Sequence, residues 1–437
     1  MPRKSIHEIR DPVHGFIKIT DDERSLVDSP AVQRLRQIHQ LALTFLVYPG
    51  ATHRRFEHSL GTMELATRIF DVVVENLCNE VRGFVPERPD QRDHWRRTLR
   101  AAALLHDIGH LPFSHATEKE LLPAGWNHER LTYEFIRSDD IRGLLESLTP
   151  PMRAEEVAKL AVGPENAEGE DFSTWDLLLS EMIVGDVFGA DRMDYLLRDS
   201  LHAGVAYGRY DHQRLIDTLR ILPSAKKDDK EDKDSGEPEL GVEEGGIHAA
   251  EGLLLARYFM FMQVYLHHVR RIYDRHLADF LMGWLPGGKF PTTMDRFLAI
   301  TDSEVTSAIH EQHREGSDLA KRIAERKHFK LLYERNPDDI EVNPEARQRV
   351  YDNAVEQFGQ RNVRQDSFAE NVSILSYPVR MLNGDVVDSR ARSEVLGRLP
   401  NAKVDYVFAA REKIDEARKW LKENRQEILT AEGETDG

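Results

Sequence analysis

Four long stretches with a helical spacing of apolar residues constrain the fold more than any other feature of this sequence. The spacing between Glu57 and Leu77 predicts an amphipathic helix. Arg100 to Ile108 is apolar on nearly all sides, which is typical of a helix in the centre of a bundle. Leu177 to Leu197 and Gly252 to Met282 repeat the helical period. The chain is therefore expected to be mostly α-helical.

Composition divides the chain into four regions. A strongly charged stretch without apolar periodicity is expected to form a flexible insertion that interrupts the helical part. After Asn336 the pattern changes to strands at Val372–Val379 and Val404–Phe408 followed by a helix at Ala409–Ile428. The predicted regions are a core at residues 1–225, the charged flexible insertion at 226–246, a helical continuation of the core at 247–336 and a small α/β C-terminal region at 337–437.

The charge balance and the cysteine content limit the function classes. The formal net charge of −17 argues against an overall electrostatic footprint for nucleic acid. It leaves room for an anionic substrate, because a bound cation reverses the field locally. Cys78 is the only cysteine, which excludes an internal disulfide. There is no apolar run long enough to cross a membrane and no secretory signal, so a cytoplasmic protein without a membrane partner is expected.

The segment HDIGHLPFSH places His106 beside Asp107, with His110 one turn later and His115 at its end. Adjacent histidine and aspartate at the end of a buried helix are costly unless a partner compensates the charge. A divalent cation bound by both would remove that cost. Imidazole together with carboxylate suits Mn, Fe, Zn or Ni better than Ca, which prefers oxygen ligands throughout.

A single His-Asp pair is a weak signal, since a chance dipeptide at a helix end looks the same. Two further residues change this interpretation. His58 in RFEHSLG opens one predicted helix, and Asp191 in DRMDYL follows another. His58, His106, Asp107 and Asp191 thus occur in the order His, then His-Asp, then Asp over three helical segments.

This ligand order resembles that of the HD-superfamily phosphohydrolases. The motifs DPVHG at residues 11–15, QRLRQIHQL at 33–41, YPGATHRRFEHSLG at 48–61 and NHE at 127–129 resemble the dNTP triphosphohydrolase branch, some of whose members carry a sterile alpha motif. The resemblance is dense over about residues 6–215 and thin afterwards. It implies an HD-domain helical bundle with a small α/β C-terminal appendage.

In the branch that it resembles, a metal-activated water attacks the α-phosphorus of a dNTP and releases deoxynucleoside and triphosphate. The resemblance implies a divalent transition metal (Mn, Fe, Zn or Ni) on the four ligands and an additional Mg²⁺. Histidine suits the proton transfers, because its pKa lies near working pH. His115 matches the general acid on the leaving oxygen, and Glu118 would orient its imidazole. The catalytic set implied by the resemblance is His115, His110, His128, Glu118 and Arg55.

The resemblance also implies contacts to the sugar and phosphates of the substrate. The matching positions are Gln40, Leu41, Arg192, Tyr195, Asp199 and Tyr273. Tyr265 stands where the family has an arginine, which puts the far phosphates in doubt; His267, His268, Arg270 or Arg271 would have to substitute, and His276 would face the phosphates as well. For each residue the alternative is a solvated helix charge or a structural hydrogen bond.

Nucleotide activation is a further expectation from the family, whose members form tetramers with nucleotides between subunits. A homo-oligomer, dimer or tetramer, activated by GTP or dGTP is therefore expected here. The matching activator-site residues are Asp28, Gln33, Arg36, Arg326 and Lys330, although His7 replaces a family lysine. A surface network of salt bridges is the alternative.

Two other functions stay open. A phosphodiesterase or nuclease would use the same metal site on a cyclic nucleotide or nucleic acid, although the acidic balance does not favour nucleic acid. A non-catalytic nucleotide sensor is the second, although the intact set of four ligands disfavours it. A dNTP is thus the expected substrate.

Overall fold

The computed structural model describes residues 5–114, 118–167, 169–224, 237–370 and 376–430. They fall into two compact units, each made of three separate segments of the chain. Unit 1 takes in the described parts of residues 1–260, 289–303 and 372–400. Unit 2 takes in those of residues 261–288, 304–371 and 401–437.

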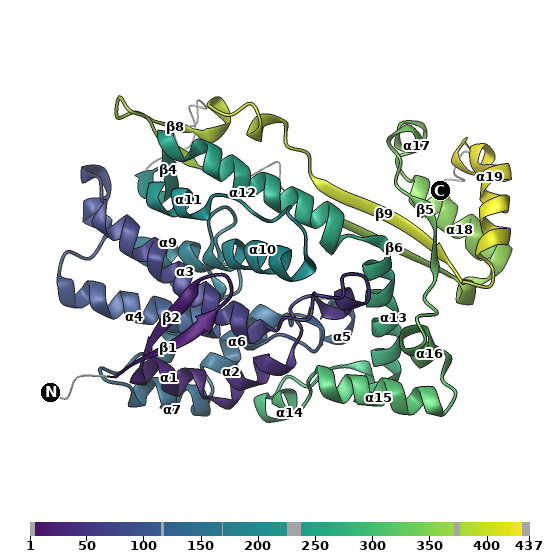
Figure 1. Cartoon of the computed structure of the whole chain (residues 1–437), viewed down its shortest axis with the longest axis horizontal. Helices are drawn as coiled ribbons and strands as arrows, with labels where there is room; N and C mark the ends of the chain where they lie inside the picture. The colour runs from purple at the N-terminus through teal and green to yellow at the C-terminus, as the bar shows by residue number, and fades with distance from the viewer. Residues whose placement is uncertain (1–4, 115–117, 168, 225–236, 371–375, 431–437) are drawn as a thin grey trace. The chain divides into compact units, whose positions relative to one another are not determined.

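A bundle of helices forms the centre of unit 1. Helix α3 (Arg55–Glu75) packs against α4 (Pro89–Leu105) and α10 (Ala190–Ala203) (Figure 1). Helix α4 also packs against α8 (Ala154–Val162). The buried face of α3 follows the predicted helical spacing. The prediction of a mostly α-helical fold is confirmed. No helix in the described part of the chain is long and apolar enough to span a membrane.

The predicted continuous helix at 177–197 is wrong, because the chain turns sharply in its middle. Helix α9 (Thr174–Val184) ends before Gly185, and α10 begins after Gly189. A Cβ on Gly189 would lie 2.6 Å from the carbonyl oxygen of Gly185, so the turn requires glycine there. The break places Asp191 in the first turn of α10 rather than within a longer helix.

Two small β structures belong to unit 1. Strands β1 (Ile6–Asp11) and β2 (Gly15–Thr20) form an antiparallel hairpin. The second structure is a four-stranded sheet in the order β3 (Leu219–Pro223), β4 (Pro238–Glu243), β7 (Pro378–Arg380), β8 (Val386–Asp388).

Strand β4 corrects the predicted flexible insertion at 226–246. Residues 225–236 lie outside the described part of the chain, but the last part of the predicted insertion pairs with β3 and β7. Leu240 and Val242 are buried on one face of this sheet. Their alternation is a strand signal, and the surrounding charges and glycines concealed it.

Unit 2 contains an antiparallel sheet in the order β5 (Lys330–Glu334), β9 (Ala402–Ala409), β6 (Val363–Glu370). Helices α18 (Ala346–Phe358) and α19 (Ile414–Thr430) share a buried core with it. The predicted strand at 404–408 lies within β9. Helix α19 begins five residues after the predicted start at Ala409, because Ala409 still belongs to the strand. The predicted strand at 372–379 is described only at its end, in β7.

The remaining helices connect these structures. In unit 1 they are α1 (Asp21–Val27), α2 (Pro30–Arg34), α5 (Glu118–Leu121), α6 (His128–Ile136), α7 (Asp139–Ser147), α11 (His212–Thr218), α12 (Ile247–Met260) and α14 (Met294–Leu298). Unit 2 has α13 (His268–Trp284), α16 (Asp318–Ala324) and α17 (Pro337–Val342), and α15 (Asp302–Arg314) begins at the end of unit 1. The predicted helix at 252–282 is thus α12 and α13, separated by a π-helical turn at Phe261–Tyr265.

Glu181 on α9 makes the stability of unit 1 depend on pH. Burial raises the pKa of this carboxyl from 4.5 to about 7, although it accepts a hydrogen bond from the Leu240 amide at 3.1 Å. A raised pKa stabilises the fold below the unfolded value, and this stabilisation is lost as pH rises through the folded value. Glu181→Gln is therefore expected to raise the melting temperature at pH 8 and to have little effect at pH 5.

Thermal denaturation at the two pH values measures this difference. Glu356→Gln on the exposed side of α18 serves as the control and should behave alike at both. An equal shift for Glu181→Gln at pH 5 and pH 8 would contradict the assignment.

Candidate metal centre

Three of the four predicted metal ligands meet in unit 1. His58 lies in the first turn of α3, His106 caps the C-terminus of α4, and Asp191 lies in the first turn of α10. One Asp191 oxygen is 2.9 Å from His58 Nε2 and 3.5 Å from His106 Nε2. One nitrogen or oxygen atom from each residue lies within 4.8 Å of the others, so the three residues could hold a metal ion. We call His58, His106 and Asp191 the metal group.

The hydrogen bonds of His106 fit a metal ligand. Its Nδ1 is 2.8 Å from the Ala103 carbonyl oxygen, which can only accept, so Nδ1 carries the proton. Its Nε2 is buried and has no hydrogen-bond partner among the described residues. A buried acceptor beside a carboxylate oxygen is well explained by a shared cation. The donor set of imidazoles and carboxylate suits a divalent transition metal.

Asp107, the fourth predicted ligand, lies against the same two histidines. Its Oδ1 is 3.3 Å from His106 Nε2, and its Oδ2 is 3.7 Å from His58 Nε2. Arg55 also donates to Oδ2 at 2.6 Å, and His110 Nε2 lies 3.1 Å from Oδ1. Burial opposes ionisation of this carboxyl, but Arg55 and the histidines hold its pKa well below the ordinary value. Asp107 therefore stays a carboxylate that links the metal group to Arg55 and His110.

A proton and a metal ion compete for His58. Burial lowers the pKa of this histidine, but hydrogen bonds to Asp191 and Asp194 outweigh burial and raise the pKa to about 10. A metal ion bound at Nε2 has to displace the proton there. Metal affinity is therefore expected to fall as the pH falls.

His110 and His128 stack beside Asp107, with ring centroids 4.0 Å apart. Burial, together with the positive charges of Arg55 and His128, lowers the pKa of His110 well below its usual range. Burial also acts on His128, but Glu118, which lies 2.9 Å from its Nδ1, raises the pKa of that imidazole. The pKa values of the two stacked imidazoles are therefore shifted in opposite directions. The predicted general acid His115 lies outside the described residues.

Glu118, His128 and Glu129 form a second group that could hold a metal ion. Glu118 accepts hydrogen bonds from the backbone amide and the ring of His128, at 2.7 Å and 2.9 Å. Glu129 Oε2 lies 3.0 Å from the same ring nitrogen. We predicted that Glu118 would orient His115; the hydrogen bond seen here shows it beside His128.

The predicted substrate residues on α10 have different surroundings. Arg192 turns back to the loop that follows α9, where its Nη1 donates to the Val184 carbonyl at 2.7 Å and its Nη2 to Asp186 at 2.6 Å. Asp199 is buried against His53, with 2.7 Å between the His53 Nε2 and a carboxylate oxygen. Tyr195, one turn after Asp191, is half-buried. The guanidinium of Arg192 thus stabilises the loop between α9 and α10 in this structure.

Gln40 and Leu41 are buried in the segment that precedes α3. The backbone N–H of Gln40 donates to the backbone carbonyl of His53 at 3.1 Å. The neighbouring His39 carbonyl accepts from Ser114 at 2.8 Å, and Ser114 in turn accepts from Arg55 Nε at 2.8 Å. Ser114 thus connects His39, the neighbour of Gln40, to Arg55 of the predicted catalytic set.

Other predicted substrate residues belong to unit 2. Tyr273 is fully buried on α13, and the centroid of its ring lies 4.7 Å from that of the His328 ring. Arg270 donates to the Tyr265 carbonyl, and Arg271 binds Asp366 at 2.6 Å. His267 and His268 stack at 4.6 Å, and His276 accepts from the Phe329 amide at 3.1 Å.

The predicted activator residues also divide between the units. In unit 1, Arg36 donates to Gln33 at 3.0 Å and stacks over the Phe56 ring, while Asp28 pairs with Arg24 at 3.5 Å. In unit 2, Arg326 has a left-handed backbone with φ 55°, and Lys330 lies 3.2 Å from His328. The structure therefore brings Gln33 and Arg36 together.

Sequence reasoning missed the residues behind His58. Asp194, fully buried one turn after Asp191, accepts a hydrogen bond from His58 Nδ1 at 2.8 Å. His14 and Arg198 bind the same carboxylate. The signal in the sequence was the i, i+3 spacing of the two aspartates and the i, i+4 spacing of Asp194 and Arg198.

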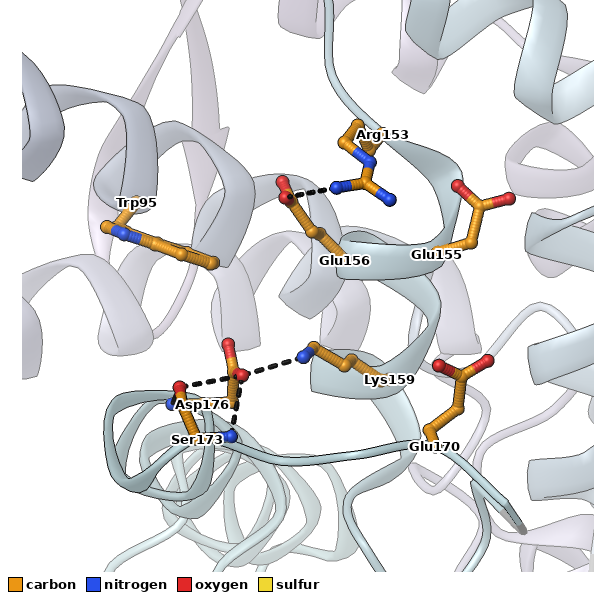
Figure 2. Close-up of a pocket in the computed structure, with 8 residues that line it drawn as sticks. All are labelled: Trp95, Arg153, Glu155, Glu156, Lys159, Glu170, Ser173 and Asp176. Atoms are coloured by element: carbon orange, nitrogen blue, oxygen red, sulfur yellow. Dashed lines mark hydrogen bonds and ion pairs between the residues drawn. The ribbon is translucent and has the colours of Figure 1, made fainter.

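A separate pocket of 220 Å³ lies along α4, α8 and the N-terminus of α9. Figure 2 shows Trp95 on one side of it and the charged side chains of α8 on the other. Its charges pair with one another, since Lys159 binds Asp176 at 2.6 Å and Arg153 lies 3.6 Å from Glu156. None of the predicted site residues lines this pocket.

Comparisons with known proteins agree with this geometry. Residues 55–198 match the HD domain, and residues 210–365 match the HD associated region. An uncharacterized protein of Methanocaldococcus jannaschii is 36% identical over 61% of this chain and 47% of its own length. The deoxynucleoside triphosphate triphosphohydrolase SAMHD1 of Mus musculus is 27% identical over 78% of this chain and 56% of its own length. The chain thus spans about half the length of the curated relatives it matches.

Among solved structures, a hypothetical protein from Aquifex aeolicus superimposes with a TM-score of 0.77. Its sequence identity is 32%, and the match covers 95% of this chain and 100% of that protein. The likeness therefore extends over both units.

Removal of one metal-group residue is expected to abolish metal binding. Mn²⁺ should raise the melting temperature of the wild-type protein, because a ligand that binds only the folded state stabilises it. In His106→Ala this increase should disappear. His94→Ala, a half-buried histidine on the same helix, is the matched control and should keep it. Equal Mn²⁺-induced shifts in both variants would show that the metal binds elsewhere.

Proposed function

Because the chain belongs to the HD-domain family, we propose that it is a metal-dependent phosphohydrolase that cleaves a dNTP to deoxynucleoside and intact triphosphate. The observation that carries the proposal is the double role of Asp107. Its carboxylate lies within 3.3 Å of a metal-group histidine and also binds Arg55 and His110. Arg55 and His110, two side chains suited to bind phosphate, thus lie beside residues that could hold a metal ion.

The bound ion would act as a Lewis acid on the phosphate and lower the pKa of water. The protein supplies the surroundings of the reacting phosphorus. Arg55 is held by Asp107 and Ser114, and its Nη2 makes no hydrogen bond with any described residue, so this group can donate to a phosphate oxygen. Charge that develops on those oxygens would be stabilised by a donor fixed in advance.

The histidine pair would hold the remaining phosphate charge. Glu118 raises the pKa of His128, whereas burial lowers that of His110. A cationic His128 beside His110 would suit a polyphosphate better than a neutral ester. We propose His115 as the proton donor to the leaving oxygen, and Tyr195 and Asp199 as contacts to the sugar.

Nucleotide activation and assembly are part of the same proposal. Gln33 and Arg36 lie together on the surface of unit 1, where a guanine edge could bind both. We propose that GTP or dGTP binds there in a homo-oligomer and raises activity. Gln33→Ala should then reduce the activation by dGTP and leave the unactivated rate unchanged. A rate that does not respond to any nucleotide would contradict activation without touching the hydrolytic function.

Product analysis tests the proposed reaction. The purified chain with Mn²⁺ and each dNTP in turn should yield deoxynucleoside and tripolyphosphate by chromatography. Deoxynucleoside monophosphate, or cleavage of an oligonucleotide or cyclic nucleotide, would support a phosphodiesterase or nuclease instead. Tight nucleotide binding without turnover under any metal would indicate a sensor.

Arg55 should be required for the rate. Loss of one preorganised donor to a developing oxyanion typically reduces the rate by about 10²–10³-fold, so Arg55→Ala is expected to lower kcat by this order. Arg54 is the matched control, because it precedes Arg55 and its guanidinium lies 3.8 Å from the Asp302 carboxylate instead of Asp107. If Arg54→Ala and Arg55→Ala lose activity to the same extent, Arg55 has no specific role.

A further inference from the structure

We propose that Asp194 is a positioning residue for the metal centre, and that the N-terminal hairpin β1–β2 takes part through Asp11 and His14. In this view the hairpin and Arg198 fix Asp194, and Asp194 fixes the ring of His58. The inference rests on the metal-dependent function proposed above, but it does not depend on the identity of the substrate.

Asp194 is surrounded by hydrogen-bond donors. Its Oδ1 accepts from His14 Nε2 at 2.6 Å and from Arg198 Nη2 at 2.9 Å. Its Oδ2 accepts from His58 Nδ1 at 2.8 Å and from Arg198 Nε at 2.8 Å. The side chains of Asp194, His14 and Arg198 are all 0% exposed, so water does not compete for these bonds.

The bond to Asp194 decides which nitrogen of His58 faces the metal group. An ionised carboxylate can only accept, so Nδ1 of His58 must carry a proton. Nε2 then faces Asp191, 2.9 Å away, and its lone pair becomes available to a metal ion that displaces the Nε2 proton. Carboxylates behind a ligating histidine set its tautomer and ring orientation in this way. Asp194 thus prepares His58 for a metal ion without contacting the ion.

The hairpin holds this arrangement from the opposite end of the sequence. Asp11 Oδ1 accepts from the amides of Val13 and His14 at 2.9 Å and 2.8 Å, which fixes the turn between β1 and β2. Its Oδ2 accepts from Arg198 Nη1 at 2.8 Å. The same turn therefore delivers His14 to Asp194 and a carboxylate to Arg198.

Gly61 on α3 leaves the space for this network. A Cβ there would lie 1.9 Å from Asp194 Oδ1 and 2.4 Å from Arg198 Nη2. Only glycine lets α3 approach α10 closely enough for His58 to reach Asp194. Gly61, Asp194, Arg198 and His58 therefore pack together as one cluster.

The experiment measures Mn²⁺ affinity of the full-length chain by isothermal titration calorimetry. Asp194→Asn keeps the shape of the side chain but cannot accept from every donor. Loss of a residue behind a metal ligand typically weakens binding by about 10–100-fold, and this rise in Kd is expected here. ¹⁵N shifts of the histidine rings give a second readout, in which His58 should lose its fixed Nδ1–H tautomer.

Glu23→Gln is the matched control. Glu23 is also a buried carboxylate paired with an arginine, Arg100, but it contacts none of the metal-group residues in the described structure. Its variant should lose stability and keep the wild-type Kd for Mn²⁺. A Kd that rises equally in both variants would reduce Asp194 to a purely structural role and overturn the proposal.

The His14 variants decide the matter if Asp194→Asn does not fold. His14→Gln retains a donor near the position of Nε2 and should bind Mn²⁺ more tightly than His14→Ala. Equal affinity of both variants and the wild type would overturn the proposal. If Mn²⁺ binding depends on Asp194 but no dNTP is hydrolysed, the positioning role stands and only the proposed substrate fails. If the wild type binds no divalent metal, both fail.

Discussion

The hydrogen bond between His58 and Asp194 is the interaction on which the centre of unit 1 depends. It joins α3 to α10 near their N-terminal ends, where the metal-group residues His58 and Asp191 lie in the first turns. The bond requires Gly61 for its closeness and Arg198 for its charge balance. A helical bundle alone would not orient an imidazole; this buried carboxylate does.

Buried charge explains why the unit needs its hairpin. An ionised group without partners is strongly destabilising in a protein interior. Asp194 and Arg198 satisfy each other in a two-point contact, and Asp11 and His14 supply the remaining partners from β1–β2. The hairpin is therefore part of the centre, because its removal would leave unpaired charges behind a metal ligand.

The sequence predicted that His58, His106 and Asp191 belong together, but not the residues behind them. His58 and His106 lie at the ends of strongly periodic helices, whereas the helix start at Asp191 was missed because the break after α9 gave no periodic signal. The partner of Asp194 could not be foreseen, because His14 lies 180 residues away and only the folded chain brings the two together. Strand β4 was missed for a local reason, since two apolar residues among charges carry little signal. The resemblance assigned Arg192 to the substrate contacts, whereas its guanidinium donates to the loop that precedes α10.

Anomalous diffraction from crystals grown with Mn²⁺ tests the central claim most directly. We expect a peak bonded to Nε2 of His58, Nε2 of His106 and Asp191, with Asp107 beside it and His58 Nδ1 still donating to Asp194. A sole peak at Glu118, His128 and Glu129, the other group able to hold a metal, would contradict it. In that case Asp194 would stabilise the bundle and have no part in metal binding.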